Sequence, residues 1–470
     1  MMAKKERKNT TSHMRIYIRL HVQNGQGRFQ IYVKNRLSSR RDTKELHIEI
    51  GMGSYGPSIE ENLIEDAIHS RLEILRNIPY GHKHDAPFFV ANMNQIVEQH
   101  QRWRNALPNI HPFYAVKCNP DPKLLRLLAD MDVNFDCASL AEIEQVLKMG
   151  IDPSRVIFAN PCKAPSALDM ATRRGIRLTT FDNSDELVKI QKISPNLELL
   201  LRIYAQDNTA TIDLGEKFGA HIEVAPKLLH TARQLGLKVV GVSFHIGSGA
   251  TDPNAFVTAV QHAKRVFDYG ELLGFNMQIL DVGGGFEDNH FEKMAYPLRE
   301  AISREFSKPI TLIAEPGRFY ASGFYTMVCQ VIARRTQGST ENNLPDMLYL
   351  NDGVYGCFSA RWAEDRVFVP TLIKPRDITM AVPREGMPSR YSIWGPTCDS
   401  LDFISKDVVM DQEIMVGDWL RFRDMGAYTT CVASRFNGFS NRYVVIYLGQ
   451  KSEHAITRKR TSCREAGKQC

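Results

Sequence analysis

The chain has 470 residues, of which 43% are hydrophobic and 24% are charged, a composition typical of a globular protein with a sizeable core. Its formal charge of +6 is unevenly placed, because residues 1–44 carry a net +10 and residues 451–470 a net +4, which leaves the central part acidic. This distribution argues against a nucleic-acid-binding body, and the basic ends are interpreted as solvated tails.

The nine cysteines are an odd number without paired short spacings, which indicates reduced intracellular thiols and no metal site. The N-terminus lacks the apolar core of a signal peptide, and no apolar run is long enough to cross a bilayer. We therefore expect a cytoplasmic protein that does not bind a membrane.

Residues 1–57 are predicted to form a basic extension, which alternates like strands at 15–20 and 29–33 but has a composition typical of disorder. A possible capping box, Ser58 with Glu61, begins an amphipathic helix expected to run to Arg76. Residues 58–87 are expected to join a β domain.

Over residues 88–322, short apolar strands alternate with helical stretches. The expected strands are 113–117, 133–137, 156–160, 178–182, 198–204, 239–245, 278–282 and 310–315. Each strand ends on or beside a polar residue that a core would not choose. Eight such β-then-α units predict a (β/α)₈ barrel with its chemistry at the C-terminal ends of the strands; a doubly wound sheet is the alternative.

After residue 322 the long helices disappear. Strand-like runs predict a separate, largely antiparallel β domain over residues 323–450, with strands at 325–334, 347–350, 419–422, 428–434 and 443–448. Loops are expected at 336–346 and 383–390, and a basic, disordered tail over 451–470.

Lys117 closes the first apolar strand of the barrel. Because desolvating an ammonium costs several kcal/mol, a lysine at this place either has a partner or does chemistry, which makes Lys117 a candidate Schiff-base lysine. The alternative is a strand-end lysine whose head reaches solvent.

Glycines 283–285 directly follow a strand, and Gly317 with Arg318 follows the next one. A tight turn would explain the triple glycine equally well, but a backbone anion nest beside a guanidinium predicts a phosphate site. Glu315 could then keep a pyridine nitrogen protonated, or form a structural salt bridge with Arg202. His245 could stack on a flat ring while Ser248 binds phosphate.

The β domain contributes Trp394-Gly395-Pro396-Thr397-Cys398-Asp399, a rigid turn with a thiol and a carboxylate. The Cys398 thiol could donate a proton to a carbanion and Asp399 could hold an amine, unless Cys398 is only a buried, inert cysteine. The phenol of Tyr428 could bind a phosphate oxygen.

In order along the chain, the motifs FYAVKCN, FDCAS, FANPCK, FHIGSG, DVGGGF, AEPGR, NDGVYG, WGPTCDSLD and MGAYT resemble the eukaryotic ornithine decarboxylase family, which binds pyridoxal 5′-phosphate in an alanine-racemase-like fold. The resemblance covers about residues 58–450. It implies that Lys117 forms the Schiff base with the cofactor, that His245 stacks on its ring and that Glu315 pairs with the ring nitrogen.

The same resemblance implies that Asp136, Glu142 and Arg202 surround the ring, that the phosphate is held by Ser248, Gly285, Gly317, Arg318 and Tyr428, and that Pro316 also binds the cofactor. It also implies that Cys398 supplies the proton that replaces the lost carboxylate, and that Asp399 binds the distal amine of the substrate. The family forms homodimers with shared sites, in which Cys398, Asp399 and Tyr428 lie at the opposite end of the pair from Lys117.

The chain departs from the family where a Tyr-Asp pair normally follows NDGVYG, because here it carries Ala363-Glu364, followed by Asp365. Ornithine is the expected substrate, since Asp399 with Glu364 or Asp365 could pair with a distal ammonium. The change leaves open arginine, lysine or an alkaloid precursor of the loline type. A catalytically inactive regulator resembling antizyme inhibitor is the alternative of another class, and an antizyme-type regulator is a possible partner.

Overall fold

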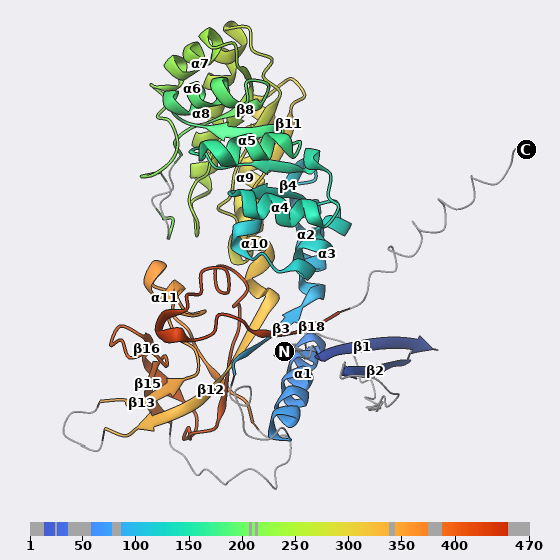
Figure 1. Ribbon diagram of the computed structural model, residues 1–470, viewed down its shortest axis with the longest axis vertical. Coiled ribbons are helices and arrows are strands. Elements are labelled where there is room, and N and C mark those ends of the chain that lie inside the picture. The colour runs from blue at the N-terminus through green and yellow to red at the C-terminus, as the bar shows by residue number, and fades with distance from the viewer. Residues whose placement is uncertain are drawn as a thin grey trace, which may run out of the picture.

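The computed structural model describes residues 14–23, 26–35, 58–77, 86–205, 209–211, 215–337, 344–374 and 388–449. Figure 1 shows a barrel above a β domain along the long axis of the molecule. Near the N-terminus, β1 (Met14–Gln23) and β2 (Gln26–Asn35) pair antiparallel and include the two predicted strand runs. The rest of the predicted extension and the tail at 451–470 lie outside the described residues.

Eight parallel strands close the barrel through pairing of the last strand with the first. They are β4 (Ile110–Ala115), β5 (Asn134–Cys137), β6 (Val156–Phe158), β7 (Leu178–Phe181), β8 (Glu198–Arg202), β9 (Lys238–Ser243), β10 (Ile279–Asp281) and β11 (Thr311–Ala314). All eight predicted strands overlap these, so the barrel prediction is confirmed and the doubly wound alternative is wrong.

A helix follows each barrel strand: α3 (Pro122–Asp130), α4 (Leu140–Lys148), α5 (Pro165–Arg173), α6 (Ser184–Ile193), α7 (Ala225–Gln234), α8 (Pro253–Leu272), α9 (Phe291–Glu305) and the short α10 (Arg318–Ala321). Several starts are fixed locally: Asp121 accepts hydrogen bonds from the first turn of α3, and Ser139 does so for α4. A separate apolar cluster that includes Phe113, Leu200 and Val240 consists mostly of barrel-strand residues, as expected for a filled barrel interior.

The second part is a mostly antiparallel sheet, as predicted. Its strands are β3 (Phe88–Asn92), β12 (Tyr325–Arg335), β13 (Asp346–Leu350), β14 (Thr371–Leu372), β15 (Ser389–Trp394), β16 (Phe403–Met410), β17 (Trp419–Phe422) and β18 (Val444–Leu448). Within the described part of this sheet, only the pairs β13–β15 and β3–β18 are parallel. Helix α1 (Ser58–Arg76) packs on this sheet, and α2 (Met93–Ala106) leads into the barrel. The short helix α11 (Ala360–Ala363) belongs to the β domain.

Three local predictions differ from the structure. Residues 88–92, placed at the start of the barrel segment, form β3 within the β sheet. Residues 383–390 were expected to be a loop, but β15 begins at Ser389. The strand expected at 428–434 does not form, because Tyr428 has a left-handed φ of 52° and donates its N–H to the carbonyl of Cys118 at 2.9 Å. This segment therefore crosses to the barrel instead of pairing in the sheet.

Candidate active site

A cavity of about 520 Å³ lies where the C-terminal ends of the barrel strands meet the β domain. The barrel contributes Ala115, Lys117, Ala138, Ala159, Asn160, Pro161, Arg202, Phe218, His245, Ser248, Gly284, Gly285, Phe286, Glu315, Gly317 and Arg318. The β domain contributes Ser359, Ala360, Ala363, Glu364, Tyr428 and Val432. Most of the residues predicted to act on a cofactor are therefore brought together.

Lys117 lies on a short 3₁₀ turn, Val116–Cys118, that follows β4, and its ammonium pairs with Asp136 at the end of β5. Burial is the largest single influence on the pKa of Lys117 and lowers it, but the charges of Asp136, Tyr428 and Glu315 with the Asp136 hydrogen bond together raise it above its ordinary value. The turn is held from both sides: Tyr114 donates to the carbonyl of Asn119 at 3.1 Å, and the side chain of Asn119 donates to Gly426 at 2.8 Å. The backbone turn that carries the lysine is thus fixed.

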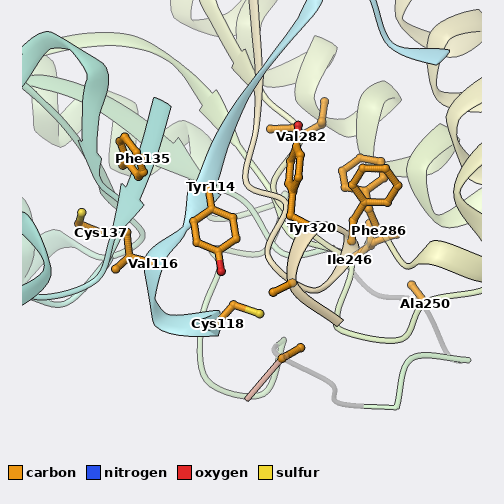
Figure 2. Close-up of a cluster of buried hydrophobic side chains, with 14 of the residues drawn as sticks. Tyr114, Val116, Cys118, Phe135, Cys137, Ile246, Ala250, Val282, Phe286 and Tyr320 are labelled. Carbon is orange, nitrogen blue, oxygen red and sulfur yellow. The ribbon is translucent and has the colours of Figure 1, made fainter. Parts of the chain in front are cut away.

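Aromatic side chains also pack beside the turn at Val116–Cys118. Tyr114 meets Tyr320 edge to face, with ring centroids 6.2 Å apart, and both lie near Cys118 in Figure 2. Because both tyrosines are fully buried, the base of the lysine turn is closed to solvent.

Three buried carboxyl groups, those of Asp136, Asp281 and Glu315, lie at or near the C-terminal ends of barrel strands, and Glu315 lines the cavity. Burial raises the pKa of Asp281 to about 7 and that of Glu315 well above its usual value, to which the charge of Asp281 adds. The charge of nearby Arg202 lowers the pKa of both carboxyl groups, against the larger effect of burial. One Asp136 oxygen and one Asp281 oxygen are buried without a hydrogen-bond partner. This surplus of acceptors fits a bound group that carries a protonated ring nitrogen.

His245 lies against the glycine loop that follows β10. Burial, with the charges of Arg202 and Lys117, lowers its pKa well below the usual value, so the ring is neutral. Its Nδ1 accepts the N–H of Gly247 at 3.0 Å. A Cβ at Gly284 would come within 2.5 Å of the ring, so a glycine is required there. The imidazole is thus held by a hydrogen bond and lines the cavity.

The residues predicted to bind phosphate gather around Arg318. Its Nε donates to Ser248 Oγ at 3.2 Å, its Nη2 donates to Glu364 at 2.7 Å, and Tyr428 places its ring 5.0 Å from the guanidinium. Gly285 has a left-handed φ of 103°, and a Cβ there would meet Gly247 O at 2.8 Å. A buried guanidinium, a hydroxyl, a phenol and glycine backbone form a cradle suited to an oxyanion.

Ala363 and Glu364 line the cavity at the end of α11, where Glu364 bonds to Arg318. Asp365, the other acidic residue considered for the substrate, pairs with Arg361, and its side chain is 91% exposed. Of the two, Glu364 is the one that can reach a ligand in the cavity of its own chain.

Cys398 and Asp399 do not line the cavity of their own chain. Cys398 is exposed and donates its backbone N–H to Asn437 at 3.0 Å, while Asp399 accepts a hydrogen bond from Tyr355. The expectation that Tyr428 lies with this pair, at the opposite end of a dimer from Lys117, is wrong. Tyr428 is in the Lys117 cavity of the same chain, because its backbone is bonded to Cys118.

Two of the predicted site residues, Glu142 and Pro316, do not line the cavity but hydrogen-bond to the backbone beside it. Glu142 accepts the N–H of Ala138 at 2.6 Å and completes a capping box with Ser139, and the carbonyl of Pro316 accepts the N–H of Ala115 at 3.2 Å. Sequence analysis assigned no role to Asp281, although it is a buried acidic residue at a strand end. Nothing in the local sequence around Phe218 and Tyr355 indicated that they lie at or near the site.

No helix among the described residues is long and apolar enough to span a membrane. Within the same ranges, no cluster of His, Cys, Asp and Glu side chains is suited to hold a metal ion.

Residues 93–322 match the pyridoxal binding domain of pyridoxal-dependent decarboxylases. The chain is 45% identical over 420 residues to the ornithine decarboxylase of Neurospora crassa, covering 84% of this chain and 87% of that protein. It is 39% identical to antizyme inhibitor 2 of Xenopus laevis, covering 83% and 87%.

The arginine decarboxylase of Paramecium bursaria Chlorella virus, bound to agmatine, superposes with a TM-score of 0.75 at 34% identity, over 82% of this chain and 100% of that one. The chain thus shares its barrel fold and most of its length with these decarboxylases. It belongs to the eukaryotic ornithine decarboxylase family of pyridoxal-dependent decarboxylases.

Proposed function

We propose that the protein is a pyridoxal phosphate-dependent decarboxylase whose principal substrate is L-ornithine, which it converts to putrescine for polyamine synthesis. The observation that carries the proposal is the cavity itself, which is lined by Lys117, the buried carboxyl group of Glu315 and the oxyanion cradle, with Asp136 paired to Lys117. The high identity to a fungal ornithine decarboxylase supports ornithine in particular.

The residues of the cavity fit pyridoxal phosphate group by group. Lys117 would hold its aldehyde carbon through the side-chain amine, His245 would stack on its ring, and Glu315 would accept a hydrogen bond from the ring nitrogen. Ser248, Gly285, Gly317, Arg318 and Tyr428 would hold the phosphate. When bound, the cofactor supplies an electron sink for the electron pair left behind as carbon dioxide departs.

A second copy of the chain would complete the site. In this proposal, Cys398 of one copy donates a proton to the substrate carbon bound in the other, and Asp399 holds the distal amine. The proposal is supported by the exposed, partly apolar surface around these residues, where Trp362 is 45% and Leu401 58% exposed. A homodimer with shared sites would bury that surface.

Ala363 and Glu364 favour a second candidate substrate. An alanine leaves room where the family has a tyrosine, and a glutamate reaches one methylene further than an aspartate. These changes suit a side chain longer than that of ornithine, such as arginine, the class of substrate named for the viral relative. A larger amino acid of secondary metabolism would fit the same change.

A regulatory protein without activity is disfavoured by the intact cofactor set. We place the protein in the cytosol, which its free cysteines support, and antizyme-type regulation remains a proposed partner interaction.

Release of carbon dioxide by the purified, cofactor-loaded protein tests the proposal. The panel is ornithine, lysine, arginine, diaminobutyrate and larger amino acids with modified side chains. Dominant turnover of ornithine supports the polyamine assignment, and dominant turnover of arginine or a larger amino acid supports the second candidate. Absence of any turnover, together with no bound-cofactor absorbance, would refute a decarboxylase.

A further inference from the structure

One buried carboxylate, that of Asp402, fastens the turn that carries Cys398 and Asp399. Asp402 is 1% exposed. Its Oδ2 accepts the backbone N–H of Thr397 at 3.0 Å and the Thr397 hydroxyl at 2.6 Å, and its Oδ1 accepts the N–H of Val354 at 2.8 Å. The carboxylate therefore joins residues 395–399, here called the Cys398 turn, to the neighbouring turn at 353–356.

Two glycines make room for this carboxylate. A Cβ added at Gly353 or at Gly395 would lie 2.2 Å from Asp402 Oδ1, far inside van der Waals contact. The backbone adds two more bonds, since the carbonyl of Asp402 accepts the N–H of Gly395 at 2.8 Å and its N–H donates to the carbonyl of Asp399 at 3.0 Å. Asp402 is thus enclosed by the turn that it holds.

The second turn makes its own contact with the acidic residue of the Cys398 turn. Tyr355, next to Val354, donates its hydroxyl to Asp399. Because hydrogen bonds to a carboxylate are among the stronger ones, three donors fix Asp402 in one orientation. That orientation sets the distance between the two turns, and with it the Tyr355–Asp399 contact.

We propose that Asp402 and Thr397 are positioning residues, whose hydrogen bonds place the Cys398 thiol and the Asp399 carboxylate relative to the substrate. This inference rests on the proposed function, in which Cys398 donates a proton and Asp399 holds the distal amine. A proton donor must lie within hydrogen-bond reach of the atom that receives the proton, and a displacement of about 1 Å can cost about 10²-fold in rate.

Thr397→Val is the main test, because valine keeps the shape of threonine and removes only the hydroxyl bond. In the holoenzyme with ornithine, we expect kcat to fall about tenfold, with KM and cofactor absorbance nearly unchanged. Thr397→Ser restores a hydroxyl and should recover kcat. Ser405→Ala is the matched control: it removes a buried hydroxyl bond of 2.8 Å in the same domain, whose acceptor, the carbonyl of Phe368, belongs to neither turn. It should leave kcat within about twofold.

A double-mutant cycle separates positioning from general destabilisation. If Thr397 acts through Cys398, Thr397→Val should have no further effect on kcat in a Cys398→Ala background, where residual turnover is measured with excess enzyme. Additive losses would overturn the inference. Asp402→Asn should show the same dependence on Cys398, provided that its melting temperature shows a folded protein.

The inference and the proposed function fail in different ways. An active wild type whose kcat is unchanged by Thr397→Val refutes positioning and leaves the decarboxylase intact. A wild type that binds the cofactor but releases no carbon dioxide from any amino acid refutes both.

Discussion

The two sides of the cavity differ in how complete they are within one chain. On the barrel side, Lys117 pairs with Asp136, and Asp281 and Glu315 are buried beside each other. On the side of the β domain, Cys398 is exposed and Asp399 points at Tyr355, outside the cavity of its own chain. The comparison indicates that the barrel side of the cavity is formed within one chain, whereas Cys398 and Asp399 lie outside that cavity.

Two lysines of the barrel differ in the same way, because the side chain of Lys163 is buried whereas that of Lys117 is 40% exposed. Lys163 Nζ donates to the carbonyls of Asn160 at 2.9 Å and Thr180 at 2.7 Å and pairs with Glu186 at 3.0 Å. All three of its donors are used, as expected of a structural lysine. Lys117 pairs with Asp136 and lines the cavity, so it is the lysine available for chemistry.

Lys117→Ala should have the largest effect. Loss of the amine that holds the cofactor is expected to lower turnover by on the order of 10³-fold or more and to abolish the absorbance band that shifts on borohydride treatment. Lys163→Met is the control: it removes one of the two lysines that pair with the buried Glu186, leaving Lys189, and should lower the melting temperature while the folded protein keeps the band. Retained turnover in Lys117→Ala would show that this lysine is not the attachment point.

Mixing two inactive variants tests whether the two sides belong to different chains. If subunits exchange freely, Lys117→Ala mixed with Cys398→Ala should regain about a quarter of wild-type turnover, because half of the dimers are mixed and each mixed dimer has one intact site. The measurement is carbon dioxide release after co-refolding or prolonged mixing. Each variant mixed with itself is the control, and no recovery despite demonstrated exchange would mean that each chain builds its own site.

The buried acids of the barrel side predict a pH dependence of stability. Asp281 has a pKa of about 7 against an ordinary value of 3.8, so the folded apoprotein keeps a proton that the unfolded chain releases. This group therefore stabilises the fold below about pH 4, and its contribution is lost as the pH rises through about 7, an effect on the order of a few kcal/mol. Asp281→Asn should flatten the fall in melting temperature between about pH 5 and 8.

Asp169→Asn, a change in a surface ion pair with Arg173, is the matched control and should keep the wild-type slope. Asp352, whose pKa burial raises to about 6, contributes a similar slope to every variant and cancels in the comparison. An unchanged slope in Asp281→Asn would mean that Asp281 does not hold this proton.

The barrel side was also the side that the sequence made predictable. Residues such as Lys117, His245 and Glu315 stand out in the sequence because each is a polar residue that follows a short apolar strand. Parallel strands of a barrel bring their C-terminal ends together, so these residues are expected to meet. The strand expected at 428–434 failed because its β-branched pattern does not reveal that Tyr428 bonds to Cys118, more than three hundred residues earlier in the chain.

The contacts of Asp402 could not be predicted from the sequence either, because they too join segments that are distant along the chain. Its three donors come from two turns that are adjacent only in space, and the two glycines that admit it read locally as ordinary turn residues. Local patterns predict which residues end a strand, but they do not predict which distant backbone groups a buried carboxylate accepts from.

The smallest expected effect is on substrate choice, where the two sides of the cavity meet. Ala363 and Glu364 line the wall between the oxyanion cradle and the β domain, and Glu364 is held there by Arg318 at 2.7 Å. Restoring the family pair with Ala363→Tyr and Glu364→Asp should narrow this wall. We expect kcat/KM for ornithine relative to arginine or a larger amino acid to rise about tenfold, since a few contacts in a pocket discriminate by about that factor.

Asp365→Asn is the control for this change, because Asp365 is exposed and pairs with Arg361 away from the cavity; the ratio of the two kcat/KM values should not move. Bound-cofactor absorbance must be the same in all variants, since Glu364 also touches Arg318 and a weakened phosphate site would lower both activities together. A ratio that stays constant in the double variant would mean that residues 363 and 364 do not select the substrate. Selection would then fall to Asp399, on the side of the cavity that one chain leaves incomplete.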